Sequence, residues 1–566
     1  MTDTSAFEVA EPILSSPFEE PPEHWWIEEG KLPERRPGRR PAGYFYRDPL
    51  APAADDEGFT RGEWMELEAV NRIRERLAQW RSEGCPGAAR TTSELIEYWR
   101  REGREWPLFF AQLEAAETVI FLREARSDLL QGIDVPLEEG GAFIRNACKM
   151  ATGSGKTTVM GMLAAWSILN KVSARNDARF SDTVLVICPN LTIRGRLREL
   201  DPIEGDASIY RTRDLVPPHL MPQLRGGRVL VKNWNQFGLK GMQAGAKVQK
   251  RGRAQTVRST IKIGERTTTG RGGKYMTVQA LELAAAQNTA RIVEDHRPAK
   301  AEVVIEETRY VESDTRWIQR VLGQEVGGKR NILVLNDEAH HAYRIRQTGP
   351  DLLEESEALD EETIEEFAQE ATVWIEGLDR IHRLRGINLC VDLSATPYYL
   401  ARAGTETNRI FPWVVSEFGL TDAIESGLVK IPQLAIADPT GEERAAYFNI
   451  WQWIMKKLTA RERGGRRASP KPEAVLKWAN PPIQLMGEDW DKTREEWAAD
   501  GEENRPPVFI LVAKNTQLAK MLYEWLAEGV SPAGVPPADL PELRNTDGQV
   551  RTIRVDSKVV QETDTE

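Results

Sequence analysis

The chain has 566 residues, of which 40% are hydrophobic and 29% charged, and its formal net charge is −12. This length corresponds to about three to four domains, and the acidic balance excludes a surface that attracts polyanions over its whole area. No stretch approaches the roughly 20 apolar residues of a membrane span, and the N-terminus lacks the basic and apolar regions of a signal peptide, so we expect a soluble, cytoplasmic protein.

Two segments of different character come first. Residues 1–60 are rich in Pro, Glu and Arg and are expected to form an extended arm. Residues 61–135 are expected to be a helical region. Apolar residues recur there at the spacing of one helix face, at Trp64, Leu67, Val70, Ile73 and Leu77.

From residue 136 to residue 430, short apolar runs alternate with helical segments. The runs are 142–150, 182–189, 228–234, 331–337 and 387–396. This alternation predicts an α/β domain in which a parallel sheet carries helices on both faces. Ligands of such sheets bind at the carboxyl ends of the strands.

A basic insertion interrupts this domain over residues 238–300. Its segment 240–277 contains ten Lys or Arg residues and one acidic residue, Glu265. Two interpretations stay open, namely contact with the phosphates of a nucleic acid and a disordered basic loop. The segment has a single aromatic residue, Tyr275, so it offers no platform for stacking bases.

The remaining chain is expected to contain a connector and the start of another domain. Residues 431–505 are expected to be a mostly helical connector. Residues 506–566 start a second strand–helix–strand pattern, with strands expected at 507–515 and 551–557 around a helix at 516–526.

The segment KMATGSGKTTVM follows the first apolar run and opens a helix. Glycines let the backbone wrap closely, so that its N–H groups can point at phosphate oxygens, and the helix N-terminus adds its positive end. Lys156 would reach the β- and γ-phosphates of ATP, and the Thr157 hydroxyl would bind Mg²⁺. The candidate nucleotide-binding residues are Thr152, Gly153, Ser154, Gly155, Lys156, Thr157 and Thr158. Met150 replaces the first glycine of the general pattern, and the alternative is a Gly-rich turn between strand and helix.

The segment ILVLNDEAHHAY ends another apolar run in two carboxylates and two histidines. Asp337 at a strand end can bind the Mg²⁺ of a nucleotide, and Glu338 can orient or deprotonate the attacking water. A structural zinc site needs four ligands that converge from spaced positions, so the adjacent His340 and His341 argue against metal chelation. His340 would instead couple the nucleotide to neighbouring segments.

Three motifs in this order carry a family resemblance. MATGSGKT, DEAH and SAT resemble motifs I, II and III of superfamily 2 helicases, which have RecA-like ATPase domains. The resemblance implies coupling roles for His340, Ser394 and Thr396. It also identifies WPLFFAQLEAAETVIFL as similar to a Q-motif, in which Gln112 would bind adenine while Phe109 or Phe110 stacks on the base.

Two further segments resemble the motifs that touch the nucleic-acid backbone. ICPNLTIRGRL is similar to motif Ia and LVKNWNQF to motif Ib, which makes Pro189, Asn190 and Asn235 candidate DNA contacts. Longer stretches resemble the Res subunit of Type III restriction enzymes, namely SPFEEPPEHW, KMATGSGKT, LVLNDEAHHAYR, DLSATPYYL and FGLTDAIESGLVKIP.

The resemblance implies an ATP-dependent DNA translocase or helicase that acts on double-stranded DNA with Mg²⁺ and a modification or specificity subunit. The segment VFILVAKN resembles motif IV of a second RecA-like domain. The sequence contains no motif VI, which carries an arginine finger in this family, and no nuclease constellation. We therefore expect an incomplete second domain that a second chain could complete. The alternatives are an ATP- and DNA-binding scaffold with little turnover, and an RNA helicase.

Overall fold

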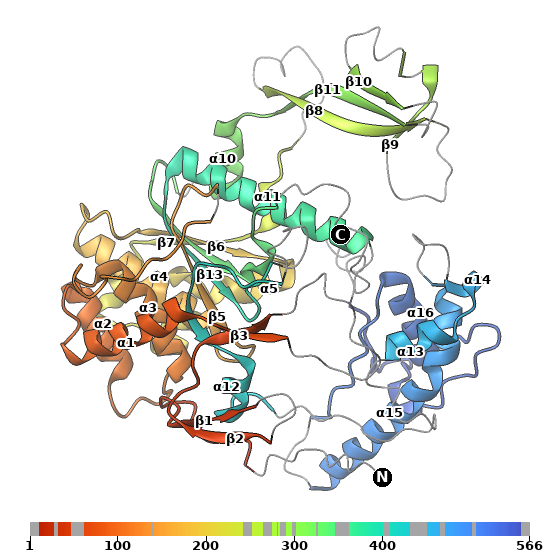
Figure 1. Cartoon of the computed structure of the whole chain (residues 1–566), viewed down its shortest axis with the longest axis horizontal. Helices are drawn as coiled ribbons and strands as arrows, with labels where there is room; N and C mark the ends of the chain where they lie inside the picture. Colours follow the sequence, from red (N-terminus) through yellow and green to blue (C-terminus); the bar gives the residue numbers. More distant parts are fainter. Residues whose placement is uncertain are drawn as a thin grey trace. The chain divides into compact units, whose positions relative to one another are not determined.

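The computed structural model divides into two compact units (Figure 1). The first comprises Met1–Glu357 and Glu362–Lys430, and the second comprises Ile431–Glu566 with Ala358–Glu361. The structure describes residues 11–27, 32–46, 62–138, 140–240, 252–263, 274–279, 281–282, 290–296, 302–323, 326–345, 361–399, 408–430, 450–463, 470–500 and 505–555.

The centre of the first unit is a six-stranded sheet in which all strands are parallel, in the order β14-β5-β13-β12-β6-β7. The strands are β5 (Arg145–Met150), β6 (Thr183–Cys188), β7 (Arg228–Asn233), β12 (Ile332–Asp337), β13 (Ile387–Ser394) and β14 (Val414–Phe418). The first five lie in the five apolar runs, which confirms the expected α/β fold with a parallel sheet. β14 lies outside these runs and was not predicted.

Helices cover both faces of this sheet, as expected. Along β12, Leu333 and Leu335 belong to one hydrophobic core, and Ile332 and Val334 belong to the other. This alternation reflects the two-residue period of a strand. The first core contains α4, and the second contains α10 and α11 (Figure 1). The helices are α4 (Lys156–Ser173), α10 (Asp314–Leu322), α11 (Glu361–Arg385) and α12 (Leu420–Glu425).

Short helices fill the connections of the first unit. The α-helical ones are α5 (Leu191–Arg196), α6 (Ile209–Thr212) and α7 (Met221–Leu224). The 3₁₀ turns are η1 (Leu197–Leu200), η2 (Pro202–Ala207), η3 (Pro218–Leu220), η4 (Trp234–Phe237) and η5 (Ala339–His341).

The N-terminal region combines small sheets with helices. Two antiparallel pairs form, β1 (Glu23–Trp26) with β2 (Glu34–Pro37) and β3 (Gly43–Tyr46) with β4 (Glu63–Glu66). The helices are α1 (Glu68–Ser82), α2 (Arg90–Arg100) and α3 (Phe110–Glu124). The helical expectation is wrong at Trp64, which lies on β4 because its segment pairs with β3.

The basic insertion contains a second sheet, in the order β10-β11-β8-β9. Its strands are β8 (Gly252–Ile263), β9 (Lys274–Met276), β10 (Ala290–His296) and β11 (Glu302–Glu312). The interpretation as a disordered loop is therefore wrong for β8 and β9. Apart from exposed Lys240, the side chains of the ten basic residues lie outside the described part of the structure, so the phosphate-contact interpretation stays a prediction.

The helices described in the second unit are connected by segments without regular structure. The unit contains α13 (Ile450–Lys457), α14 (Ala460–Arg463), α15 (Pro472–Asp500), α16 (Thr516–Ala527) and the turn η9 (Pro541–Leu543). The prediction of strands at 507–515 and 551–557 is wrong where it can be checked, because described residues 507–514 and 551–555 belong to no strand. A strand requires a partner, and no described segment pairs with either of them.

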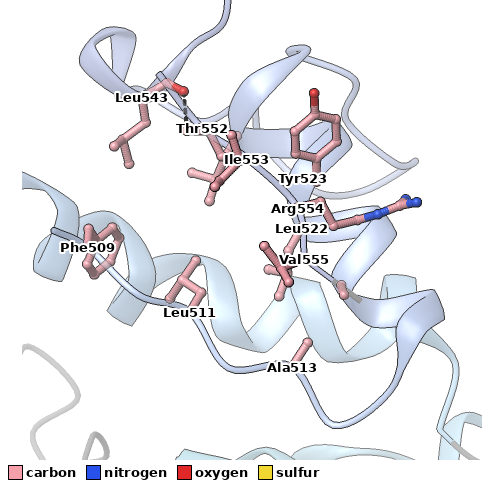
Figure 2. A pocket seen from close by; sticks show the side chains of 12 residues that line it. Phe509, Leu511, Ala513, Leu522, Tyr523, Leu543, Thr552, Ile553, Arg554 and Val555 are labelled. Carbon is pink, nitrogen blue, oxygen red and sulfur yellow. Dashed lines mark hydrogen bonds between the residues drawn. The ribbon is translucent and has the colours of Figure 1, made fainter. Parts of the chain in front are cut away.

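These two segments nevertheless line one cavity of about 130 Å³ together with side chains of α16 (Figure 2). Phe509, Leu511 and Ala513 line it from one segment, and Ile553 and Val555 line it from the other. The alternate residues Val508, Ile510 and Val512 are 80%, 73% and 92% exposed. The local pattern of a strand is therefore present without its hydrogen-bonded neighbour.

Within the described residues, no helix is both long enough and apolar enough to cross a membrane.

Candidate functional site

The Gly-rich loop joins the end of β5 to the start of α4. Gly153 and Gly155 have φ angles of 87° and 91°, in the left-handed region that side chains with a Cβ rarely adopt. Between them, buried Ser154 donates its hydroxyl to the Ala151 carbonyl at 2.7 Å. The loop therefore holds a tight turn directly before the helix, where the first backbone N–H groups have no partner within the helix.

Lys156 and Thr157 are the first two residues of α4, and both are half-buried. Thr152 and Gly153 are exposed at the loop, while Thr158 is buried in the first turn of the helix. Apart from buried Ser154, the predicted loop residues from Thr152 to Thr157 are exposed or half-buried and thus form one surface between β5 and α4. This surface lies at the carboxyl end of a central strand, where ligands of parallel sheets bind.

Gln112 contacts this loop from α3. A Cβ built on Gly155 would lie only 2.0 Å from Gln112 Nε2, so the side-chain amide occupies the space that any other residue would need. Gln112 Oε1 accepts a hydrogen bond from the backbone N–H of Phe109 at 3.0 Å. The structure therefore brings together two predicted site residues that lie 43 positions apart in the sequence.

The candidate aromatic residues next to Gln112 already have neighbours. The Phe109 ring lies 5.5 Å from the Phe18 ring, centroid to centroid. Phe110 is buried, its ring packs under the guanidinium of Arg39 at 4.9 Å, and its backbone N–H donates to the Pro17 carbonyl at 2.8 Å. The N-terminal arm thus runs beside the segment that resembles a Q-motif.

Asp337 and Glu338 lie at the carboxyl end of β12, two strands away from β5 in the sheet. Glu338 has a left-handed conformation, with φ and ψ both 50°, and this sharp bend ends the strand. Its Oε1 lies 2.8 Å from Lys156 Nζ. This ion pair directly joins the Gly-rich loop to the strand-end carboxylates.

Asp337 is 8% exposed. Burial, together with the negative charge of Glu338, raises the pKa of Asp337 to about 6 although Lys156 opposes the shift. Two adjacent carboxylates at a buried strand end favour a cation as their neighbour. Among the described residues, no group of three or more His, Cys, Asp and Glu side chains could hold a metal ion by itself.

His340 connects this strand end to the next strand. Its Nδ1 lies 2.9 Å from Ser394 Oγ at the end of β13, and the same hydroxyl accepts the backbone N–H of Thr396 at 3.0 Å. His340 Nδ1 also lies 3.5 Å from Glu338 Oε2. The three residues predicted to couple segments therefore form one chain of contacts that starts at Glu338.

His341 lies beside His340, with ring centroids 4.2 Å apart, and its Nδ1 is 3.5 Å from Glu370 Oε2. Burial, together with the smaller effect of the neighbouring His340, lowers the pKa of His341 to about 4. His341 is therefore neutral at neutral pH and acts as a packing residue of the site.

The candidate DNA-contacting residues follow β6 and β7, which are neighbours at the edge of the sheet. Trp234 Nε1 donates to the Pro189 carbonyl at 3.0 Å and so fixes one loop against the other. Asn190 and Asn235 are both exposed. The Asn190 side chain accepts the backbone N–H of Ile193 at 2.9 Å and caps α5. The structure thus brings together the loops that carry Pro189, Asn190 and Asn235. Capping of α5 is a second explanation for the asparagine at position 190.

A buried ion cluster behind the loop was not found by sequence reasoning. Lys149, on β5, donates to Glu417 Oε1 on β14 at 3.1 Å, and Arg74 of α1 donates to Glu417 Oε2 at 3.0 Å. Arg39 of the arm pairs with Glu114 of α3 and donates to the Glu417 carbonyl at 2.8 Å. No local sequence pattern predicts this ion cluster, because its five residues come from five separate segments.

Comparison with protein-family models, with curated proteins and with solved structures finds no match for this chain.

Proposed function

We propose that this chain is the ATP-hydrolysing motor of a DNA translocase or helicase from a restriction or phage-defence system, and that its parallel sheet is a RecA-like domain. The observation that carries the proposal is the contact of 2.8 Å between Lys156 and Glu338. It joins the two motifs that ATP hydrolysis needs, although they are almost two hundred residues apart in the sequence.

Each residue of the site has a role in this proposal. The backbone of Thr152–Thr158 surrounds the phosphates, and Lys156 offsets the charge of the β- and γ-phosphates. Glu338 orients or deprotonates the attacking water, as a carboxylate within reach of the same lysine can do. Gln112 binds the adenine base beside the loop.

Mg²⁺ would be held by the Asp337 carboxylate and the Thr157 hydroxyl. The residues fit this ion, because Mg²⁺ prefers oxygen ligands and usually binds through one or two carboxylates together with substrate phosphates. Asp337 is buried beside a second carboxylate, which raises its pKa and favours a cation there. Bound Mg²⁺ neutralises negative charge that develops on the phosphates.

Coupling to DNA is proposed to run through two sets of contacts. The link from Glu338 through His340 to Ser394 connects the hydrolytic carboxylate to the segment that contains Thr396. Pro189, Asn190 and Asn235 supply contacts to the DNA backbone at the edge of the sheet. Double-stranded DNA is the proposed track, with a modification or specificity subunit as the partner.

The second unit supports a role for a further polypeptide. The two extended segments around α16 carry apolar side chains that are largely exposed, including Val508 and Val512. A second chain that pairs with them would complete the sheet of a second RecA-like domain and supply the arginine finger. Without such a completion, the alternative of a scaffold with little turnover applies.

The experiment that tests the proposal measures Mg-ATP hydrolysis by the chain joined to a polypeptide that carries motifs V and VI. Duplex DNA, single-stranded DNA and RNA of equal length are compared as stimulators. Stimulation by duplex DNA is expected. Stimulation by RNA alone would favour an RNA helicase, and tight binding of ATP and DNA without turnover would favour a scaffold.

A further inference from the structure

We propose that Arg39 in the N-terminal arm is a positioning residue, which holds the first turn of α3 so that Gln112 lies against the Gly-rich loop and reads the base of ATP. This inference rests on the proposed function, since it concerns how the same site recognises its nucleotide. It assigns the arm a part in base recognition, which no motif of the sequence indicates.

Arg39 contacts α3 on either side of Gln112. Its guanidinium packs over the Phe110 ring at 4.9 Å and pairs with the Glu114 carboxylate. The side chains of Arg39 and Glu114 are 8% and 5% exposed, so this pair is shielded from solvent. Solvent screening, which makes surface ion pairs weak, is therefore small here.

The helix geometry turns these contacts into a constraint on Gln112. Residues four positions apart lie on the same face of a helix, so Phe110 and Glu114 face Arg39 together. Gln112 lies two positions from each and projects from roughly the opposite face. Arg39 therefore holds the back of the first turn, while the front presents the Gln112 amide to Gly155.

The second terminal nitrogen of the Arg39 guanidinium contacts β14, the strand next to β5. This Nη2 atom donates to the Glu417 carbonyl at 2.8 Å, and Glu417 Oε1 accepts from Lys149 Nζ at 3.1 Å. Lys149 and Glu417 also face each other in the register of β5 and β14. The Arg39 guanidinium thus joins the helix that carries Gln112 to β14, which pairs with β5, the strand that leads into the loop.

This arrangement separates the binding energy of the phosphates from the binding energy of the base. The phosphates are bound by the loop backbone and Lys156, neither of which contacts Arg39. The base is read through Gln112, whose position depends on Arg39. Loss of Arg39 is therefore expected to weaken binding of a complete nucleotide while binding of a triphosphate without a base is kept. A general loss of structure would weaken both.

The test compares two probes, Mg-ATP and Mg-tripolyphosphate, in calorimetric titrations of the full chain. Arg39→Met is expected to weaken ATP binding about fivefold to tenfold, the size of one net hydrogen bond, and to leave tripolyphosphate binding unchanged. Arg39→Lys keeps the charge without the fork that serves both Glu114 and Glu417, so it is expected to lie between wild type and Arg39→Met.

Arg36→Met is the matched control. Arg36 also lies in the arm, packs over an aromatic ring, that of Trp26 at 4.7 Å, and pairs with a glutamate, Glu34 at 2.7 Å. It has none of the contacts to α3, so its loss is expected to change neither affinity.

Because Arg39→Met leaves Glu114 buried without its partner, the double variant Arg39→Met/Glu114→Gln keeps the test usable if the single variant unfolds.

The outcomes are distinct. Equal weakening of ATP and tripolyphosphate, or no change in either, by every folded Arg39 variant would overturn the positioning role. Equal affinity of the wild-type chain for ATP and GTP would do the same, because no base would then be read. Failure of the wild-type chain to bind either Mg-ATP or Mg-tripolyphosphate would instead overturn the proposed function itself.

Discussion

At the scale of single residues, the proposed site depends on the contact between Lys156, at the start of α4, and the carboxylate of Glu338, directly after β12. Lys156 is 12% exposed and Glu338 28% exposed, so their contact is partly shielded from water. An ammonium group at the start of a helix, beside a loop of glycines, provides the point charge that phosphate groups need.

Lys156→Ala is expected to abolish ATP binding with the fold kept, because the alanine removes the charge that holds the β- and γ-phosphates. Binding of a fluorescent ATP analogue measures the effect. Lys171→Ala is the control, since Lys171 is a half-buried lysine of the same helix that donates to the Asp177 carbonyl instead. Undiminished binding by Lys156→Ala would contradict the assignment of the loop.

Glu338→Gln and Asp337→Asn are expected to differ in their effects. Glu338→Gln should leave ATP binding intact and slow hydrolysis about 10²-fold or more, the scale of a lost general base. Asp337→Asn should weaken the dependence on Mg²⁺, because it removes a ligand. Steady-state hydrolysis over a range of Mg²⁺ concentrations separates the two, and if both variants behave like wild type in the assembled enzyme, the strand-end carboxylates have been misassigned.

At the scale of elements, α12 anchors the N-terminal arm through its last residue, Glu425. The Glu425 carbonyl accepts the backbone N–H groups of Leu14 and Ser15, and its carboxylate contacts Arg40 and the backbone N–H of Trp25. Burial raises the pKa of Glu425 to about 7, although Arg40 opposes this shift. The folded protein therefore keeps a proton that the unfolded chain releases at lower pH.

The free energy of unfolding should consequently depend on pH through Glu425. The stabilisation that Glu425 contributes is fully present below about pH 4.5 and is lost as the pH rises to about 7. The free energy of unfolding lost over this pH range is at most about 3 kcal/mol. Glu425→Gln is expected to remove this decrease, as measured by denaturant unfolding from pH 5 to pH 8. Exposed Glu102→Gln is the control. Parallel pH profiles for wild type and Glu425→Gln would contradict the prediction.

At the scale of the whole molecule, the sequence contains the proposed phosphate-binding lysine and the proposed catalytic carboxylates but no motif VI. An arginine finger contributes about 10³ to 10⁵ in rate in other enzymes with this kind of loop. We therefore expect the purified chain to bind Mg-ATP, to hydrolyse it very slowly and to show no DNA-stimulated burst. Robust DNA-stimulated hydrolysis by the monomer would mean that an arginine of this chain already acts as the finger.

The extended segments of the second unit are expected to promote association. Described residues 507–514 carry strongly exposed apolar side chains and pair with no strand, which is a known hazard for edge-to-edge contacts. Val512→Lys should reduce self-association in sedimentation velocity and change the unfolding free energy by less than about 0.5 kcal/mol. Val530→Lys, at another exposed valine, is the control. Equal association of wild type and Val512→Lys would exclude this segment as the cause.

Local sequence determined the parallel sheet and the two ends of the candidate site. Apolar runs followed by helical segments predict β5, β6, β7, β12 and β13, because burial on both faces leaves a continuous apolar signature in each strand. The glycines before Lys156 and the carboxylates after an apolar run are equally local signals. Each can be recognised without knowledge of its partner.

Only the tertiary structure decided what these segments meet. The pairs Arg39–Glu114 and Lys149–Glu417 join residues 75 and 268 positions apart, and no periodicity encodes such contacts. The same reason explains the errors at residues 507–514 and 551–555. Their alternation of apolar side chains favours a strand, but a strand forms only where a neighbouring backbone supplies hydrogen bonds, and that partner is a property of the fold and not of the segment.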